Sequence, residues 1–129
     1  MRDTLLIVDD MEINRTILRT LFESEYNLLE AENGEQALLL IRQYHASLAA
    51  ILLDLLMPVK NGYQVMEELS HNGLMSNIPI IVITAQDSSE NEIRALDLGA
   101  ADIIIKPFKP HVVRRRVQNA VELTRYKIH

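Results

Sequence analysis

Short apolar runs alternate with longer amphipathic segments along the whole chain. The apolar runs lie at residues 4–8, 26–31, 48–53, 79–84 and 101–105. Their shortness, their β-branched content and their polar flanks favour strands over helices. The run at 26–31 is the least apolar of the five, which is typical of a strand at the edge of a sheet.

Between these runs, apolar residues recur at the spacing of a helix. They are Ile13, Ile17, Leu18 and Leu21; Ala37, Leu38 and Ile41; Val65, Met66 and Leu69; Ile93, Leu96 and Ala100; and Val113, Val117, Ala120 and Val121. Asn-Gly at 33–34 and 61–62 ordinarily forms a hairpin turn, but helix-period residues follow both copies, so both are predicted to lead into helices. Gly99 is predicted to end the fourth helix.

Five strands strictly alternating with five helices predict a doubly wound α/β domain, with a parallel sheet covered by helices on both faces. The length of 129 residues suits one domain. No break in composition, low-complexity tract or internal repeat interrupts residues 1–129. The sequence therefore predicts a single domain.

Composition excludes several classes of function. The chain has 13 basic and 18 acidic residues, a net charge of -5, which disfavours direct binding to nucleic acid or to an anionic membrane. It has no cysteine, which excludes disulfides, thiol catalysis and cysteine-based zinc sites. The first apolar run is too short for a signal peptide or a membrane span. We expect a cytoplasmic location, and the scattered histidines 45, 71, 111 and 129 are expected on the surface.

Chemically reactive groups follow the central strands of the predicted sheet. The first strand ends on Asp9 and Asp10, the third on Asp54, the fourth on Thr84 and the fifth on Lys106. In an open parallel sheet, functional groups gather outside the carboxyl ends of the strands. Each residue alone could be a helix cap, a strand end or a solvated lysine. Their joint occurrence at one edge indicates a site.

Electrostatics indicate a divalent cation at this site. Two carboxylates about 4 Å apart repel by about 4 kcal/mol at an effective dielectric near 20. Three carboxylates and one lysine sum to a charge of about -2, which one divalent cation neutralises. Hard oxygen ligands, without cysteine or paired histidine, favour Mg²⁺ over zinc.

A carboxylate beside Mg²⁺, a lysine and a hydroxyl is suited to accept a phosphoryl group. One carboxylate attacks phosphorus, the cation neutralises charge on the equatorial oxygens, and the lysine and the threonine contact the other oxygens. The product is a labile acyl phosphate, which suits a transient signal.

Over nearly its whole length the chain resembles the receiver domain of two-component response regulators. The motifs that carry the resemblance, each weak alone but specific in this order, are Asp9-Asp10, the segment with Asp54, Met57, Pro58 and Gly62, Thr84-Ala85, and Lys106-Pro107-Phe108. The resemblance implies a flavodoxin-like fold with strand order 2-1-3-4-5, and a regulatory domain rather than an enzyme. It also implies a cis Lys106–Pro107 bond, which proline makes accessible at about 0.5–1 kcal/mol.

The resemblance assigns roles to individual residues. Asp54 is expected to be the phosphoacceptor, with Thr84 and Lys106 binding the phosphoryl oxygens. Asp10, Asp54 and the backbone carbonyl of Leu56 are expected to ligate Mg²⁺, and Asp9 to act largely through water.

The resemblance also implies partners. A sensor histidine kinase or a phosphotransfer protein is expected to supply the phosphoryl group from a phosphohistidine. The chain is either a piece of a longer protein with an output domain or a stand-alone receiver, and a homodimer is compatible with both. The run Arg114-Arg115-Arg116 is interpreted as a solvated helix face, with a partner-binding surface as the alternative.

One position departs from the family pattern. Receivers often carry an aromatic residue three positions before the conserved lysine, and here that position is Ile103. Its β-branch restricts χ1, so we expect it to stay packed. Switching is instead predicted to run from Thr84 through the loop at 85–89 into the following helix.

Three alternatives share parts of this pattern. A flavodoxin-like cofactor-binding domain needs a phosphate loop after the first strand, where the acidic "DDMEIN" repels phosphate. A phosphatase with an aspartyl nucleophile commonly carries Asp-x-Asp, and "DLL" at 54–56 lacks the second acid. A degenerate receiver that only binds partners is expected to lack one of the five groups.

Overall fold

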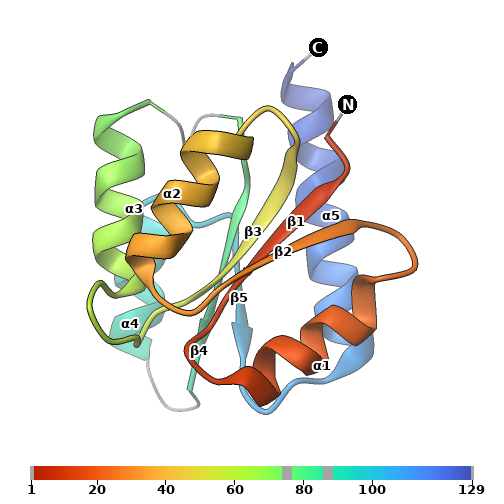
Figure 1. Cartoon of the computed structure of the whole chain (residues 1–129), viewed down its shortest axis with the longest axis horizontal. Coiled ribbons are helices and arrows are strands. Elements are labelled where there is room, and N and C mark those ends of the chain that lie inside the picture. Colours follow the sequence, from red (N-terminus) through yellow and green to blue (C-terminus); the bar gives the residue numbers. More distant parts are fainter. Residues whose placement is uncertain (1, 74–76, 86–88, 129) are drawn as a thin grey trace.

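The computed structural model describes residues 2–73, 77–85 and 89–128 as strictly alternating strands and helices (Figure 1). The strands are β1 (Thr4–Val8), β2 (Asn27–Ala31), β3 (Leu48–Asp54), β4 (Ile80–Thr84) and β5 (Asp102–Ile105). The helices are α1 (Glu12–Phe22), α2 (Gly34–Tyr44), α3 (Gly62–His71), α4 (Ser89–Asp97) and α5 (Pro110–Ile128). The strand and helix predictions are confirmed, with boundaries shifted by a residue or so.

The strands form one parallel sheet in the order β2-β1-β3-β4-β5, so the predicted order and the edge position of the second strand are confirmed. The register pairs Val8 with Leu53 and Asp54 with Ile83. Because all strands run the same way, their carboxyl ends meet at the lower edge of the sheet in Figure 1.

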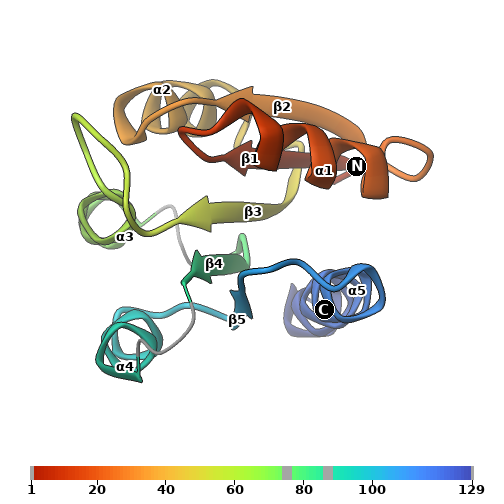
Figure 2. The ribbon, with the colours of Figure 1, turned by 90° about the horizontal axis from the view of Figure 1, so that it is seen from below.

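Each face of the sheet carries its own hydrophobic core. Figure 2 shows α2, α3 and α4 on one side of the sheet and α1 and α5 on the other. Successive residues of a strand point to opposite faces, so Leu6 and Val8 enter the first core while Leu5 and Ile7 enter the second. The central strand β3 is buried along its whole length.

Asparagine starts two of the helices, as the sequence predicts. The side-chain oxygens of Asn33 and Asn61 accept hydrogen bonds from the backbone N–H groups of residues three positions later, Gln36 and Gln64. In α3, the Gln64 side chain also accepts from the Asn61 N–H, which completes a capping box. Gly99 follows α4 with φ of 106°, a conformation in which glycine is favoured.

The helical spacing is confirmed, but some of the apolar residues that define it do not face the core. Ile13 and Ile17 of α1 are 64% and 40% exposed, and Ile93 and Leu96 of α4 are 60% and 51% exposed. Within α4, Ala95 is the buried residue. A helical period fixes which residues share a stripe, whereas the docking of the helix decides which stripe is covered.

Surface expectations are partly confirmed. Histidines 45, 71 and 111 are exposed, and His129 lies outside the described residues. The arginine run is not simply solvated, because Arg114 pairs with Glu25 at 2.5 Å and Arg116 with Asp102 at 2.6 Å. Among the described residues, no helix is both long enough and apolar enough to cross a membrane.

Candidate functional site

The three predicted aspartates meet at the carboxyl edge of the sheet. Asp9 and Asp10 follow β1 and Asp54 ends β3, and one carboxylate oxygen from each lies within 4.8 Å of the other two. Asp9 and Asp54 are buried, whereas Asp10 is exposed. The cluster therefore combines two buried carboxylates with one that is open to solvent.

Lys106 and Thr84 complete the set from the neighbouring strands. The Lys106 Nζ lies 3.7 Å from Asp9 Oδ2 and 3.8 Å from Asp54 Oδ2. Thr84 is buried at the end of β4, and its backbone carbonyl accepts a 2.9 Å hydrogen bond from the Lys106 N–H. The five groups that the sequence places at strand ends therefore occupy one edge. The predicted cis bond between Lys106 and Pro107 is also confirmed.

The donor set fits a divalent cation. Asp9 Oδ1 accepts hydrogen bonds from the Met11 N–H at 2.9 Å and from Asn14 Nδ2 at 3.4 Å. In the part of the chain that the structure describes, Asp9 Oδ2 is buried and no hydrogen bond reaches it. A buried charged oxygen without a hydrogen bond is costly. Together with Asp10 and Asp54 it offers the hard oxygen ligands that Mg²⁺ prefers.

The surroundings of Asp54 raise its pKa. Burial has the largest effect and the neighbouring Asp9 adds to it, while Lys106 and the Leu56 N–H act in the opposite direction. The outcome is a pKa of about 7 instead of 3.8. A cation at the cluster would reverse this balance, because positive charge stabilises the carboxylate.

The segment after β3 packs tightly against Asp54. The Leu56 N–H donates to Asp54 Oδ1 at 3.3 Å, and the Gly62 N–H donates to the Leu55 carbonyl at 3.0 Å. A Cβ on Gly62 would lie 2.6 Å from the Asp54 carbonyl, which real Cβ atoms do not tolerate. Glycine at 62 therefore lets α3 begin directly against the end of β3.

A strained turn follows Leu56. Val59 has φ of 67°, and the Lys60 N–H donates to the Pro58 carbonyl at 2.7 Å. The left-handed conformation costs a non-glycine residue about 1–2 kcal/mol, and a β-branched side chain is rare there. Such strain concentrates at functional segments of proteins, and this one lies beside the aspartate cluster.

The sequence analysis did not identify Arg15, which contacts the backbone of Asp9 in the site. Arg15 is buried in α1, and its Nη1 donates to the Asp9 carbonyl at 2.7 Å. The signal was present in the sequence, because Arg15 lies on the same helical stripe as Leu18 and Phe22, the other buried residues of α1. A charged residue on a buried stripe requires a specific partner.

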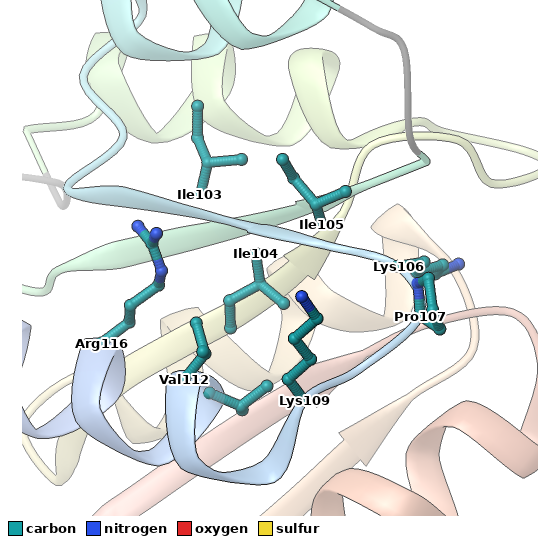
Figure 3. Close-up of a pocket in the computed structure, with 9 residues that line it drawn as sticks. Ile103, Ile104, Ile105, Lys106, Pro107, Lys109, Val112 and Arg116 are labelled. Carbon is teal, nitrogen blue, oxygen red and sulfur yellow. The ribbon is translucent and has the colours of Figure 1, made fainter.

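A cavity of about 360 Å³, with Lys106 among its lining residues, lies between β5 and the first turns of α5 (Figure 3). In the figure Ile104 points toward α5, whereas Ile103 and Ile105 point to the other face of β5. Among the residues that the structure describes, none that lines this cavity carries a carboxylate. The cavity includes Ile103, the position at which the family often carries an aromatic residue.

Comparisons with known proteins agree with this geometry. The family model described as the response regulator receiver domain matches residues 5–118. The chain is 40% identical over 116 residues to probable transcriptional regulator ycf27 of Cyanidium caldarium, covering 89% of this chain and 45% of that protein. It is 35% identical to histidine kinase P4 of Formosa agariphila, covering 94% of this chain and 9% of the kinase.

Solved structures show the same fold. The receiver domain of the Francisella response regulator 1452 superposes with a TM-score of 0.85 at 29% identity, covering 95% of this chain and 99% of that one. The chain spans about half the length of the curated transcriptional regulators that it matches. The family match covers nearly all of the folded core, and the aspartates of the cluster lie within it; the chain therefore belongs to the response regulator receiver domain family of two-component signalling.

Proposed function

We propose that Asp54 accepts a phosphoryl group and that the domain passes this signal on as a conformational change. The observation that carries the proposal is the position of Asp54 at the end of β3, among Asp9, Asp10 and Lys106. A receiver domain is a regulatory module, and an acyl phosphate on an aspartate is labile enough for a signal.

The chain's own groups prepare the carboxylate for attack on phosphorus. Asp54 forms the new O–P bond while the P–N bond of a phosphohistidine breaks, and the leaving imidazole nitrogen keeps the electron pair and takes up a proton from solvent. The Lys106 ammonium, 3.8 Å from Asp54 Oδ2, offsets the charge of the incoming phosphoryl oxygens. Thr84 at the adjacent strand end is proposed to bind another of these oxygens.

Asp9, Asp10, Asp54 and the backbone carbonyl of Leu56 are proposed to hold Mg²⁺. When bound, the cation would neutralise phosphoryl charge and keep Asp54 deprotonated. The donor set supports this assignment, because it consists of hard oxygen atoms and includes the buried Asp9 Oδ2.

The phosphoryl donor is proposed to be a histidine kinase or a phosphotransfer protein, as is general for receiver domains. The recipient of the signal is proposed to be an output region, because the chain matches only part of each longer relative. The conformational change is proposed to begin at Thr84, which ends β4 and precedes α4. Of the predicted switch loop at 85–89, residues 86–88 lie outside the described residues.

Phosphorylation from a small phosphodonor tests the assignment of Asp54. The wild-type chain and an Asp54→Asn variant are incubated with labelled acetyl phosphate and Mg²⁺, and the incorporated label is counted. Asp54→Asn is expected to remain unlabelled, whereas Asp97→Asn, at an exposed residue of α4, is expected to be labelled like the wild type. Equal labelling of Asp54→Asn would refute the proposal, and full labelling in excess chelator would refute the requirement for Mg²⁺.

A further inference from the structure

Arg15 is a buried cation directly behind the acidic pair. Its side chain is 10% exposed and lies on the stripe of α1 that faces the core. Its Nη1 donates to the Asp9 carbonyl at 2.7 Å, and its Nε donates to Glu30 Oε1 at 3.2 Å. Burying a guanidinium is costly unless its hydrogen bonds are made, so both contacts matter.

The contact completes a set that holds Asp9 by its backbone and its side chain. The Asp9 N–H donates to the Ala31 carbonyl at 3.1 Å, and the Asp9 carbonyl accepts from Arg15. Asp9 Oδ1 accepts from the Met11 N–H and from Asn14 Nδ2. The carbonyl that Arg15 binds belongs to the peptide that joins Asp9 to Asp10. Rotation of this peptide would redirect the Asp10 side chain, because Asp10 follows it immediately.

Arg15 is itself held in place by β2. Glu30 Oε1 accepts from Arg15, and the second oxygen of the same carboxylate, Oε2, accepts from Arg19 Nη1 at 2.7 Å. The planar guanidinium presents donors in several fixed directions, so it can bind a carbonyl and a carboxylate together. A lysine ammonium on a flexible stem is less well suited to bridge both groups.

We propose that Arg15 is a positioning residue for the divalent-cation site. By holding the Asp9 carbonyl, it fixes the peptide that orients Asp10. This inference rests on the proposed function, because it takes the aspartate cluster to bind the cation. The simpler alternative is that Arg15 only fastens α1 to β2 through Glu30.

Arg19 separates the two explanations. Arg15 and Arg19 lie one turn apart on α1 and bind the same carboxylate, Glu30. Arg15 also lies 3.8 Å from the exposed carboxylate of Glu32, and it is Arg15 that binds the Asp9 carbonyl. Both arginines fasten the helix to β2. If fastening were the whole role of Arg15, removing either guanidinium would have a similar effect on the cation site.

The test is a Mn²⁺ titration of the metal-free protein, followed by the electron paramagnetic resonance signal of the free ion, with Mg²⁺ as competitor. Loss of a group that orients a metal ligand typically weakens metal binding about 10–100-fold, and we expect at least about tenfold for Arg15→Met. Arg19→Met, which breaks a partly exposed ion pair, is expected to stay within about twofold of the wild type. With acetyl phosphate, Arg15→Met should need more Mg²⁺ for half-maximal labelling and reach a similar maximal rate.

Equal metal affinity in folded Arg15→Met and wild type would overturn the inference, and so would an equal loss in Arg15→Met and Arg19→Met. Should circular dichroism show that Arg15→Met does not fold, Arg15→Lys and Glu30→Gln replace it, and wild-type affinity in both would overturn the inference. Asp10→Asn reports separately on the proposed function. If that variant binds the cation like the wild type, the cluster itself is wrongly assigned.

Discussion

Two neighbouring helices on the same face of the sheet, α3 and α4, are anchored to very different degrees. The helix α3 follows Asp54, begins with a capping box and buries five residues, Gly62, Tyr63, Val65, Met66 and Leu69. The helix α4 follows Thr84 and buries Ala95, while its Ile93 and Leu96 remain exposed. A large apolar side chain stabilises by about 1.5–3 kcal/mol when fully buried, so the difference amounts to several kcal/mol.

The two helices touch through a small polar contact. The Arg94 guanidinium lies over the Tyr63 ring, 4.0 Å from its centroid, and the Tyr63 hydroxyl donates to the Asn91 carbonyl at 3.4 Å. Arg94 also lies 3.8 Å from Glu67. These interactions are worth about 1 kcal/mol each or less at exposed sites.

The two helices are suited to different roles, α3 to holding the site in place and α4 to moving when the site changes. The proposed phosphoacceptor Asp54 is backed by a firmly packed helix, so its position is defined before the phosphoryl group arrives. Thr84 precedes the weakly anchored helix, and regions that move in switching are drawn from the less stable parts of a fold. We therefore expect α4 to respond to the site and α3 to stay in place.

The largest expected effect is on the free energy of unfolding, and it comes from the charge of Asp54, which lies next to the firmly packed α3. In the metal-free folded protein its pKa is about 7, against 3.8 in an exposed chain, so between these values the folded state binds the extra proton. The free energy of unfolding should fall as pH rises from about 4 to 7 and then level off, by up to about 4 kcal/mol. Urea denaturation in chelator at a series of pH values measures this slope. Asp54→Asn should flatten it and be the more stable protein at pH 8; parallel curves would contradict the prediction.

Gly62→Ala should disturb the start of α3. The new Cβ would lie 2.6 Å from the Asp54 carbonyl and 2.9 Å from Leu55 Cα. Overpacking against backbone typically costs about 1–3 kcal/mol, and we expect the upper end together with slower phosphorylation. Gly73→Ala is the control, because its Cβ meets nothing within 4 Å, although its φ of 70° costs about 1–2 kcal/mol. Urea denaturation measures the loss of stability in both variants, and labelling with acetyl phosphate measures their phosphorylation. Normal labelling in folded Gly62→Ala would show that α3 does not position Asp54.

Arg94→Met should loosen α4 without affecting α3. The change removes the contact with the Tyr63 ring and the ion pair with Glu67, for a loss of about 0.5–1 kcal/mol. Hydrogen exchange should become faster in Ser89–Asp97 and remain unchanged in Gly62–His71. Lys109→Met, at an exposed residue outside both helices, serves as the control. An equal increase of the exchange rate in both helices would contradict the proposal that α4 is anchored less firmly than α3.

The smallest expected effect is at Ile103, whose half-buried side chain packs against the same core as α3 and α4. With and without beryllofluoride as a phosphoryl mimic, its χ1 should stay the same while the amides of α4 shift. NMR of isoleucine methyl groups measures the rotamer, and backbone N–H NMR measures the amide shifts of α4. Thr84→Ala should abolish the shifts in α4, since the proposed motion begins at that hydroxyl. A large rotamer change at Ile103 with an immobile α4 would reverse the assignment.

Much of this molecule follows from local patterns. Five short β-branched runs and the helical spacing between them predict the alternating fold, and the polar residues that end the strands predict the site. Asp54 is an example, because a carboxylate directly after "LAAILL" stands where a buried strand leaves the core. The Asn-Gly pairs predict helix starts for the same local reason, since asparagine caps the helix that follows it.

What escaped prediction depends on how the elements dock. The sequence placed Ile93 and Leu96 on a helical stripe, but only the packing of α4 on the sheet left that stripe in solvent. Arg15 likewise gained its role from β2, whose Glu30 lies fifteen positions away and reaches it only in the folded sheet.

The sequence by itself determined the kinds of groups at the site and the strands that carry them, because strand ends and helix starts are set by neighbouring residues. Tertiary structure alone decided that Asp54 has a pKa of about 7, since burial and the nearby Asp9 arise only when β1 and β3 pair. It also decided that α3 buries five residues, whereas in α4 Ala95 is the buried residue. Helical spacing describes one helix at a time, whereas burial depends on the surfaces that meet it.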